Sequence, residues 1–127
     1  MHTDPVNWTV ELYPPWSEAG PVRKAIQQQP RKNRARIMRR LESLEEFGPH
    51  RLGSGHVKKV KRSREGVLEL RILGVSSFRL FFVCIGHIIV VVHAFRKQGP
   101  GFTGDDVKAA DSRAGKAKEW YKEQSLR

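Results

Sequence analysis

Several short stretches of the chain alternate between apolar and polar residues. Residues 8–13 read W-T-V-E-L-Y, and this period of two predicts a strand that the next two prolines end. Residues 67–73 alternate in the same way, which puts Glu69 and Arg71 together on one face of a second strand. Three further segments read as strands: a basic one at 57–61, an aromatic-rich one at 78–85 and an apolar one at 87–95.

Between the first strand and the others, apolar residues recur at helical spacing. Residues 18–29 are weakly periodic, whereas 33–47 carry a clear apolar face that ends at a Gly-Pro pair. These two segments predict a helical hairpin. After a Gly/Pro-rich loop at 98–103, Thr103 and Asp106 stand at capping-box spacing and predict a final helix with a stripe of mostly small residues.

The order of the elements is strand, two helices, four strands and a helix, which predicts an α+β fold. The connections between the last four strands are too short for parallel crossovers, so these strands are expected to be antiparallel. The apolar run at 87–95 fits a central strand covered on both faces. We expect one domain over residues 1–127, with an antiparallel sheet, an N-terminal helical hairpin and a C-terminal helix.

Charge is the property that narrows the function most. The chain has 127 residues and a formal net charge of +11. Residues 23–64 contain fourteen Lys or Arg and only three acids, so they hold the whole excess, while the rest of the chain is balanced. This concentration predicts a surface that tracks phosphate groups, with nucleic acid as the first candidate partner and an anionic membrane surface as the second. The alternative is that these basic residues only form the solvent-exposed face of a helix and bind no partner.

Other features exclude several classes of function. The single cysteine, Cys84, lies in an apolar run and is expected to be a small buried side chain, and one cysteine cannot form a disulfide within the chain. No apolar run is long enough to span a bilayer and no signal-peptide pattern is visible, so we expect a cytoplasmic protein. The five histidines lack metal-ligand spacing, and neither a phosphate loop nor a nucleophile elbow is present. We therefore expect no metal and no cofactor.

Three motifs together point to a known family. They read G-V-L-E-L-R-I-L at 66–73, F-R-L-F-F-V at 78–83 and I-V-V-V-H-A-F-R-K-Q at 89–98. The combination of Glu-Leu-Arg, an aromatic followed by Arg, and Phe-x-Lys resembles the RelE/HigB toxins, most closely their phage-derived branch, over about residues 33–122. The resemblance implies a RelE-like fold and the toxin component of a type II toxin–antitoxin system. It further implies an endoribonuclease that cleaves messenger RNA on the translating ribosome, beside 16S rRNA, with a helix-turn-helix antitoxin as partner.

The resemblance also implies a metal-independent reaction in which the ribose 2′-OH attacks the adjacent phosphate. That reaction needs positive charge where the phosphorane develops, and groups that move protons. Arg79 corresponds to the charge-stabilising arginine, and Lys97 or Arg96 to the basic pair at the end of the last strand. Arg71 belongs to the Glu-Leu-Arg motif, where it binds phosphate or pairs with Glu69. A purely structural pairing with acids is the alternative for both Arg71 and Arg79.

The sequence departs from the best-known members in two ways. Their strand lysines are replaced here by Val67 and Glu69, and their C-terminal tyrosine has no clear counterpart. The proton acceptor is therefore Glu69, His93 or neither, and His93, in an apolar strand, also fits a satisfied core histidine. RNA binding is expected from seven basic residues: Lys58, Lys59, Lys61, Arg62, Arg96, Arg39 and Arg40.

Two other functions fit the same sequence. A ParE-like toxin would share the fold but poison a topoisomerase, although such toxins generally lack the arginines and lysines needed for RNA cleavage. A non-catalytic, phage-derived nucleic-acid-binding protein is the second alternative, because the tyrosine and the strand lysines are missing. In the toxin interpretation, we expect the antitoxin to cover the basic surface.

Overall fold

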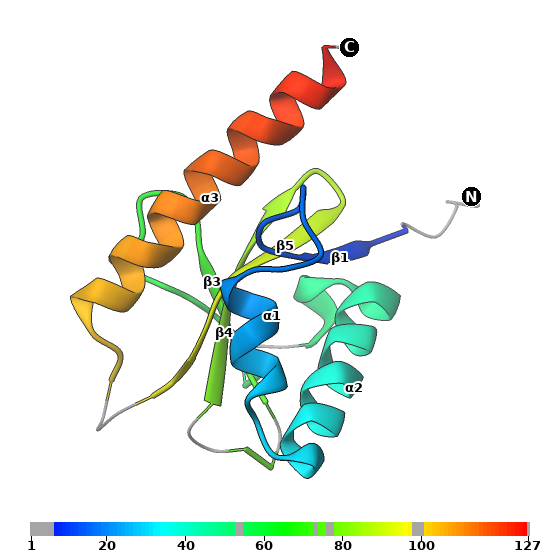
Figure 1. Ribbon diagram of the computed structural model, residues 1–127, viewed down its shortest axis with the longest axis vertical. Coiled ribbons are helices and arrows are strands. Elements are labelled where there is room, and N and C mark those ends of the chain that lie inside the picture. Colours follow the sequence, from blue (N-terminus) through cyan, green and yellow to red (C-terminus); the bar gives the residue numbers. More distant parts are fainter. Residues whose placement is uncertain (1–6, 53–54, 73, 76–77, 98–100, 127) are drawn as a thin grey trace.

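A mixed five-stranded sheet forms the centre of the protein, with the strand order β1-β5-β4-β3-β2 (Figure 1). The computed structural model describes residues 7–52, 55–72, 74–75, 78–97 and 101–126. Its elements are β1 (Thr9–Leu12), α1 (Pro21–Gln27), α2 (Arg31–Phe47), a 3-10 turn η1 (Pro49–Leu52), β2 (Val57–Lys59), β3 (Leu68–Arg71), β4 (Phe78–Ile85), β5 (Ile88–Arg96) and α3 (Gly104–Ser125).

The strand directions follow from the lengths of the connections. β2 to β5 are antiparallel neighbours, as their short connections predict. β1 instead pairs with β5 in parallel, with Thr9 opposite Ile88 and Leu12 opposite Val91. These two strands are separated by most of the chain, so no hairpin forces them to be antiparallel. The α+β class is confirmed, and the one parallel pair makes the sheet mixed.

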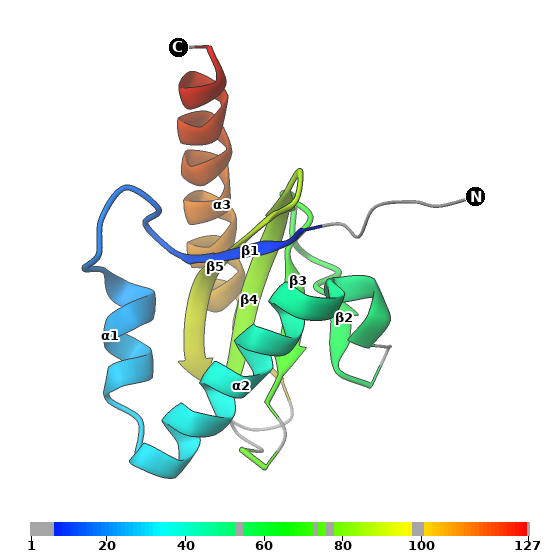
Figure 2. The same ribbon diagram turned by 90° about the vertical axis from the view of Figure 1, so that its right-hand side faces the viewer.

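Helices cover both faces of the sheet. α1 and α2 pack on one face, while α3 crosses the other (Figure 2). The C-terminal part of α3 extends beyond the sheet. β5 lies between β1 and β4, and its residues 89–92 are fully buried, which confirms the predicted central strand. No helix within the described ranges is both long and apolar enough to cross a bilayer.

The helix boundaries have local causes. α1 begins at Pro21, whose ring suits the first turn of a helix, rather than at residue 18. α2 begins directly after Pro30, two residues earlier than predicted. The predicted capping box of α3 is confirmed: Thr103 Oγ1 accepts from the Asp106 amide at 3.3 Å, and Asp106 Oδ2 accepts from the Thr103 amide at 3.0 Å.

The exposure of Cys84 and the conformation of Gly74 are two further local features of the fold. Cys84 is exposed, so the prediction of a buried side chain is wrong; it lies at the end of β4, beside the turn at Gly86. Gly74 has φ +80°, a left-handed backbone conformation that favours glycine, and the guanidinium of Arg36 packs against its Cα. Parts of the predicted segments lie outside the described residues, namely 73, 76–77 and 98–100.

Candidate functional site

A positively charged cleft lies at the β2 side of the sheet. Its volume is about 340 Å³, and it is formed by β2, the loop that follows, β3, the end of β5 and the segment that leads into α3. Six cationic side chains and one carboxylate line it. They are seven of the predicted site residues, Lys58, Lys59, Lys61, Arg62, Glu69, Arg71 and Lys97, and Gly101 and Phe102 complete the wall.

The antiparallel register explains why these side chains meet. Lys58 pairs with Glu69, and Glu69 pairs with Phe81, so the three lie in one row across β2, β3 and β4. Arg71 pairs with Arg79 in the neighbouring row. Side chains that are directly opposite in a sheet point to the same face. The predicted shared face of Glu69 and Arg71 is thereby confirmed, and Arg79 is on it too.

Glu69 stands between two guanidinium groups. Its Oε1 lies 3.7 Å from the Nε of Arg71 and 3.7 Å from the Nε of Arg79. The Glu69 and Arg79 side chains are 6% and 10% exposed, whereas Arg71 is 38% exposed and reaches the cleft. Arg79 also donates from Nη1 to the carbonyl of Phe78 at 3.1 Å. Arg79 therefore lies beneath the cleft, and Arg71 carries the positive charge of this cluster to its surface.

His93 is on the same face of the sheet but does not line the cleft. Phe81 lies between it and Glu69 in the row, and the ring is enclosed from the α3 side. Its Nε2 is 2.9 Å from Asp106 Oδ1, and Arg113 Nη1 is 3.2 Å from its Nδ1. Because an arginine can only donate, Nδ1 accepts and Nε2 donates to Asp106. Burial lowers the pKa of His93, and this geometry fits a neutral, fully satisfied ring.

Arg113 is a residue that the sequence did not single out. Register shifts at Phe81/Phe82 leave Val92 without a partner on β4, and Arg113 Nη1 donates to the Val92 carbonyl at 3.0 Å. The guanidinium also lies 5.9 Å from the centre of the Tyr13 ring. Arg113 therefore holds α3 against an irregularity of the sheet. No pattern along the chain links it to Val92, since the contact depends on how α3 crosses β5.

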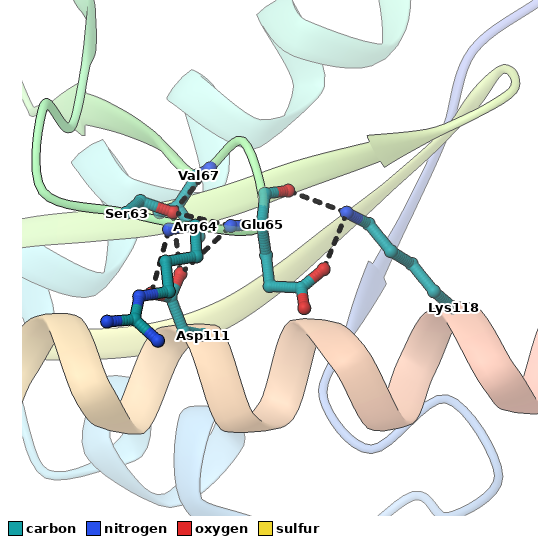
Figure 3. Close-up of polar contacts among 6 residues, drawn as sticks. All are labelled: Ser63, Arg64, Glu65, Val67, Asp111 and Lys118. Atoms are coloured by element: carbon teal, nitrogen blue, oxygen red, sulfur yellow. Dashed lines mark hydrogen bonds and ion pairs between the residues drawn. The ribbon is translucent and has the colours of Figure 1, made fainter.

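The loop between β2 and β3 is anchored by α3, which no pattern along the chain predicts (Figure 3). The carboxylate of Asp111, on α3, accepts from Ser63 Oγ at 2.6 Å and from the Arg64 amide at 3.0 Å. Lys118, also on α3, donates to the carbonyl of Glu65 at 2.6 Å and to its carboxylate at 3.0 Å. Asp111 and Lys118 are seven residues apart, a spacing that predicts a shared helix face but not the loop it holds.

A second basic surface lies on α2, where a groove of about 590 Å³ is lined by Lys32, Ala35, Arg36, Arg39, Arg40 and Ser43. It contains the predicted residues Arg39 and Arg40. The Nε of Arg40 donates to the carbonyl of Arg71 at 3.3 Å, and burial lowers the pKa of this guanidinium. The two basic surfaces therefore meet at Arg71, whose side chain lines the cleft. The last predicted residue, Arg96, is exposed at the end of β5 and lines neither surface.

The arrangement allows two kinds of chemistry. Six cations around a concave surface can bind a polyanion and stabilise negative charge that develops on it. Glu69 is the one carboxylate that lines the cleft among the described residues, so it is the candidate there for moving a proton. Within the same ranges, no group of three or more His, Cys, Asp or Glu side chains is arranged to bind a metal ion.

Fold and site together define a small α+β protein whose sheet carries a cleft of mainly positive charge. The model of a family described as phage-derived protein Gp49-like (DUF891) matches residues 24–115, well over half of the chain. The chain belongs to this Gp49-like family, a toxin-like family related to RelE. No curated protein matches it. The matched residues run from α1 into α3 and include every described residue of the cleft.

Proposed function

We propose that this protein is the toxin of a type II toxin–antitoxin system and that it cleaves messenger RNA in the cleft. The observation that carries the proposal is the convergence of six cations and one carboxylate in one cleft, with Arg79 of the third motif directly beside Glu69. Glu69 and Arg71 belong to one motif and Lys97 to another, yet they line one concave surface. Membership of a toxin-like family related to RelE supports the same conclusion.

In this proposal, each part of the site has a separate task. The exposed lysines and Arg62 hold the RNA backbone. Arg71 and Lys97 stabilise the charge on the phosphorane as the ribose 2′-OH attacks, the P–O5′ bond breaks and the 5′ oxygen leaves as a hydroxyl with a proton from solvent. Arg79, which is buried beside Glu69, holds the cluster in shape and adds positive potential from below. Glu69 either accepts the proton of the 2′-OH or acts only as counter-ion.

The α2 surface gives the proposal its second contact with RNA. Arg39 and Arg40 lie in a groove lined by four cations and no acid, which suits the phosphates of structured RNA such as 16S rRNA. We propose that the protein uses this surface on the translating ribosome while the cleft takes the messenger. A helix-turn-helix antitoxin would silence the toxin by covering one or both surfaces, since uncompensated charge favours a complementary partner.

A non-catalytic RNA-binding role is the second candidate. It is favoured by the burial of Arg79 and by the ion pairs that Glu69 makes with both arginines, because these contacts occupy the groups that catalysis would use. Such a protein would keep its affinity for RNA and show no turnover. The lysines of β2 and its loop would carry that affinity unchanged.

The test is induced expression in growing cells, followed by primer extension on cellular messages. Wild type is compared with Lys97→Gln and Arg71→Gln, and with the control Lys122→Gln, an exposed lysine near the end of α3. Growth arrest with new message ends, both lost in the two cleft variants and kept in the control, is the expected result. Arrest without cleavage would point to a topoisomerase poison, and no arrest to the non-catalytic protein; either outcome refutes the nuclease.

A further inference from the structure

A second basic depression adjoins the cleft. It has a volume of about 440 Å³ and is lined by Arg62, Arg64, Gly104, Val107, Lys108 and Asp111. Arg62 lines both the cleft and this depression, so the two hollows lie on either side of one side chain. A strand that leaves the cleft past Arg62 therefore enters the second depression directly.

The backbone that carries Arg62 and Arg64 is held in place by α3 (Figure 3). Asp111 accepts from Ser63 Oγ and from the Arg64 amide, and its Oδ1 also lies 3.4 Å from the Glu65 amide. Ser63 Oγ in turn accepts from the Val67 amide at 3.0 Å. A loop that is ordered before binding loses less conformational entropy when a ligand arrives, so its two arginines are preorganised for an anion.

The charges in the depression favour a phosphate group. Three cations face one carboxylate, and that carboxylate, Asp111, already receives three donors from the loop. The start of α3 adds little, because the capping box of Thr103 and Asp106 already accepts two of its amide donors and brings a carboxylate to this end of the helix. The depression has no aromatic lining among the described residues, so it lacks a platform on which a base would stack. Its chemistry therefore suits the sugar–phosphate backbone rather than a base.

We infer that Arg62, Arg64 and Lys108 form a flanking subsite that binds the phosphodiester backbone of an RNA strand next to the segment in the cleft. The inference deepens the proposed function and rests on it for the identity of the strand. Because phosphate contacts carry no sequence information, the subsite raises affinity for longer strands without changing which nucleotides are chosen. Asp111 is a positioning residue for this subsite, since it acts through the loop.

The experiment measures binding of single-stranded 2′-O-methyl oligonucleotides, which lack the attacking hydroxyl, by fluorescence anisotropy over a range of salt concentrations. A trinucleotide can fill the cleft alone, whereas a dodecanucleotide reaches beyond it. Wild type is compared with the double variant Arg64→Gln/Lys108→Gln. The control is Lys24→Gln/Lys122→Gln, which removes the same charge from exposed positions outside both hollows.

For the dodecanucleotide, losing two phosphate contacts should reduce the slope of log K against log salt by about 1.4, at roughly 0.7 per contact for single strands. Trinucleotide binding and the control should match wild type apart from a small uniform weakening. Equal slopes in the double variant and the control would overturn the subsite, as would a wild type that binds no dodecanucleotide. A lost slope in a protein that never cleaves RNA in cells would instead leave the subsite standing and refute the nuclease.

Discussion

Replacing Glu69 separates the structural from the chemical role of the carboxylate at the centre of the cleft. The Glu69→Gln substitution keeps the shape of the side chain and removes its charge. Two guanidinium groups then face a neutral amide, and one of them, on Arg79, is almost completely buried. The other, on Arg71, remains accessible to water. The two ion pairs should therefore differ in strength although their distances are the same.

The magnitude follows from distance and burial. At 3.7 Å, opposite unit charges in an environment of effective dielectric constant near 20 attract by about 4 kcal/mol. Breaking a buried pair by removing one partner typically costs about 3–5 kcal/mol, whereas an exposed pair is worth about 1 kcal/mol or less. We expect Glu69→Gln to lower the free energy of unfolding by about 3 kcal/mol, mostly through Arg79.

Urea unfolding of single and double variants measures this difference. A double-mutant cycle should give a coupling energy of about 2 kcal/mol for Glu69 with Arg79, and less than about 1 kcal/mol for Glu69 with Arg71. The dependence of unfolding on urea should keep the same slope in all variants. If the coupling with Arg71 equalled or exceeded that with Arg79, the electrostatic account of the cluster would be wrong.

The same variant tests the chemistry of Glu69. If the carboxylate accepts the proton of the ribose hydroxyl, Glu69→Gln should slow cleavage by about 10²–10⁴-fold at a temperature where the variant stays folded. If Glu69 is only a counter-ion, the folded variant should keep its cleavage rate within about tenfold of wild type. The rate of the folded variant therefore decides between the two roles, because urea unfolding measures the loss of stability separately.

Three further predictions concern the rest of the fold. Burial lowers the pKa of His93 below 6.5, so the unfolded chain binds a proton more readily than the folded protein does. The free energy of unfolding should therefore fall as the pH drops below 6.5. An NMR titration of the ring checks the pKa, and a His93→Gln variant should lack this pH dependence of stability. Thr103→Ala should reduce the unfolding free energy by about 1 kcal/mol in urea, with Thr103→Ser near wild type. Cys84 should react with a thiol reagent in the folded protein, but more slowly than free cysteine, because burial raises the pKa of the thiol; reaction only after unfolding would contradict its exposed position.

The patterns that predicted the strands also account for part of the cleft. Glu69 and Arg71 share a face because a strand has a period of two, and short connections place β2, β3, β4 and β5 side by side. These two rules make β2 and β3 antiparallel neighbours, but the register that brings Lys58 opposite Glu69 comes from the structure. The burial of Arg79 could not be predicted in the same way, because it depends on the covering layer above the strand and not on the strand itself.

The contacts by which α3 positions the site could not be predicted from the sequence. The contacts of Asp111 with the loop and of Arg113 with Val92 depend on the angle at which a helix crosses the sheet, and that angle is set by the packing of a whole face. Cys84 shows that a sequence pattern can also predict too much burial. An apolar run predicted burial along its whole length, but at the end of β4 Cys84 is exposed and Ile85 only partly buried, just before the turn at Gly86.

The acids near the cleft explain why its positive charge survives folding. Glu65 pairs with Lys118, Asp106 caps α3 and holds His93, and Asp111 receives the loop amides. Glu69 faces the arginines of its own cluster. Each carboxylate thus meets groups that hold the fold together, and none of these contacts is to the lysines of the cleft. A net charge that appears as an excess in the sequence therefore becomes a local positive field at the cleft and on α2. Neutralising two cleft lysines should weaken RNA binding more than neutralising Lys24 and Lys122, which line neither surface.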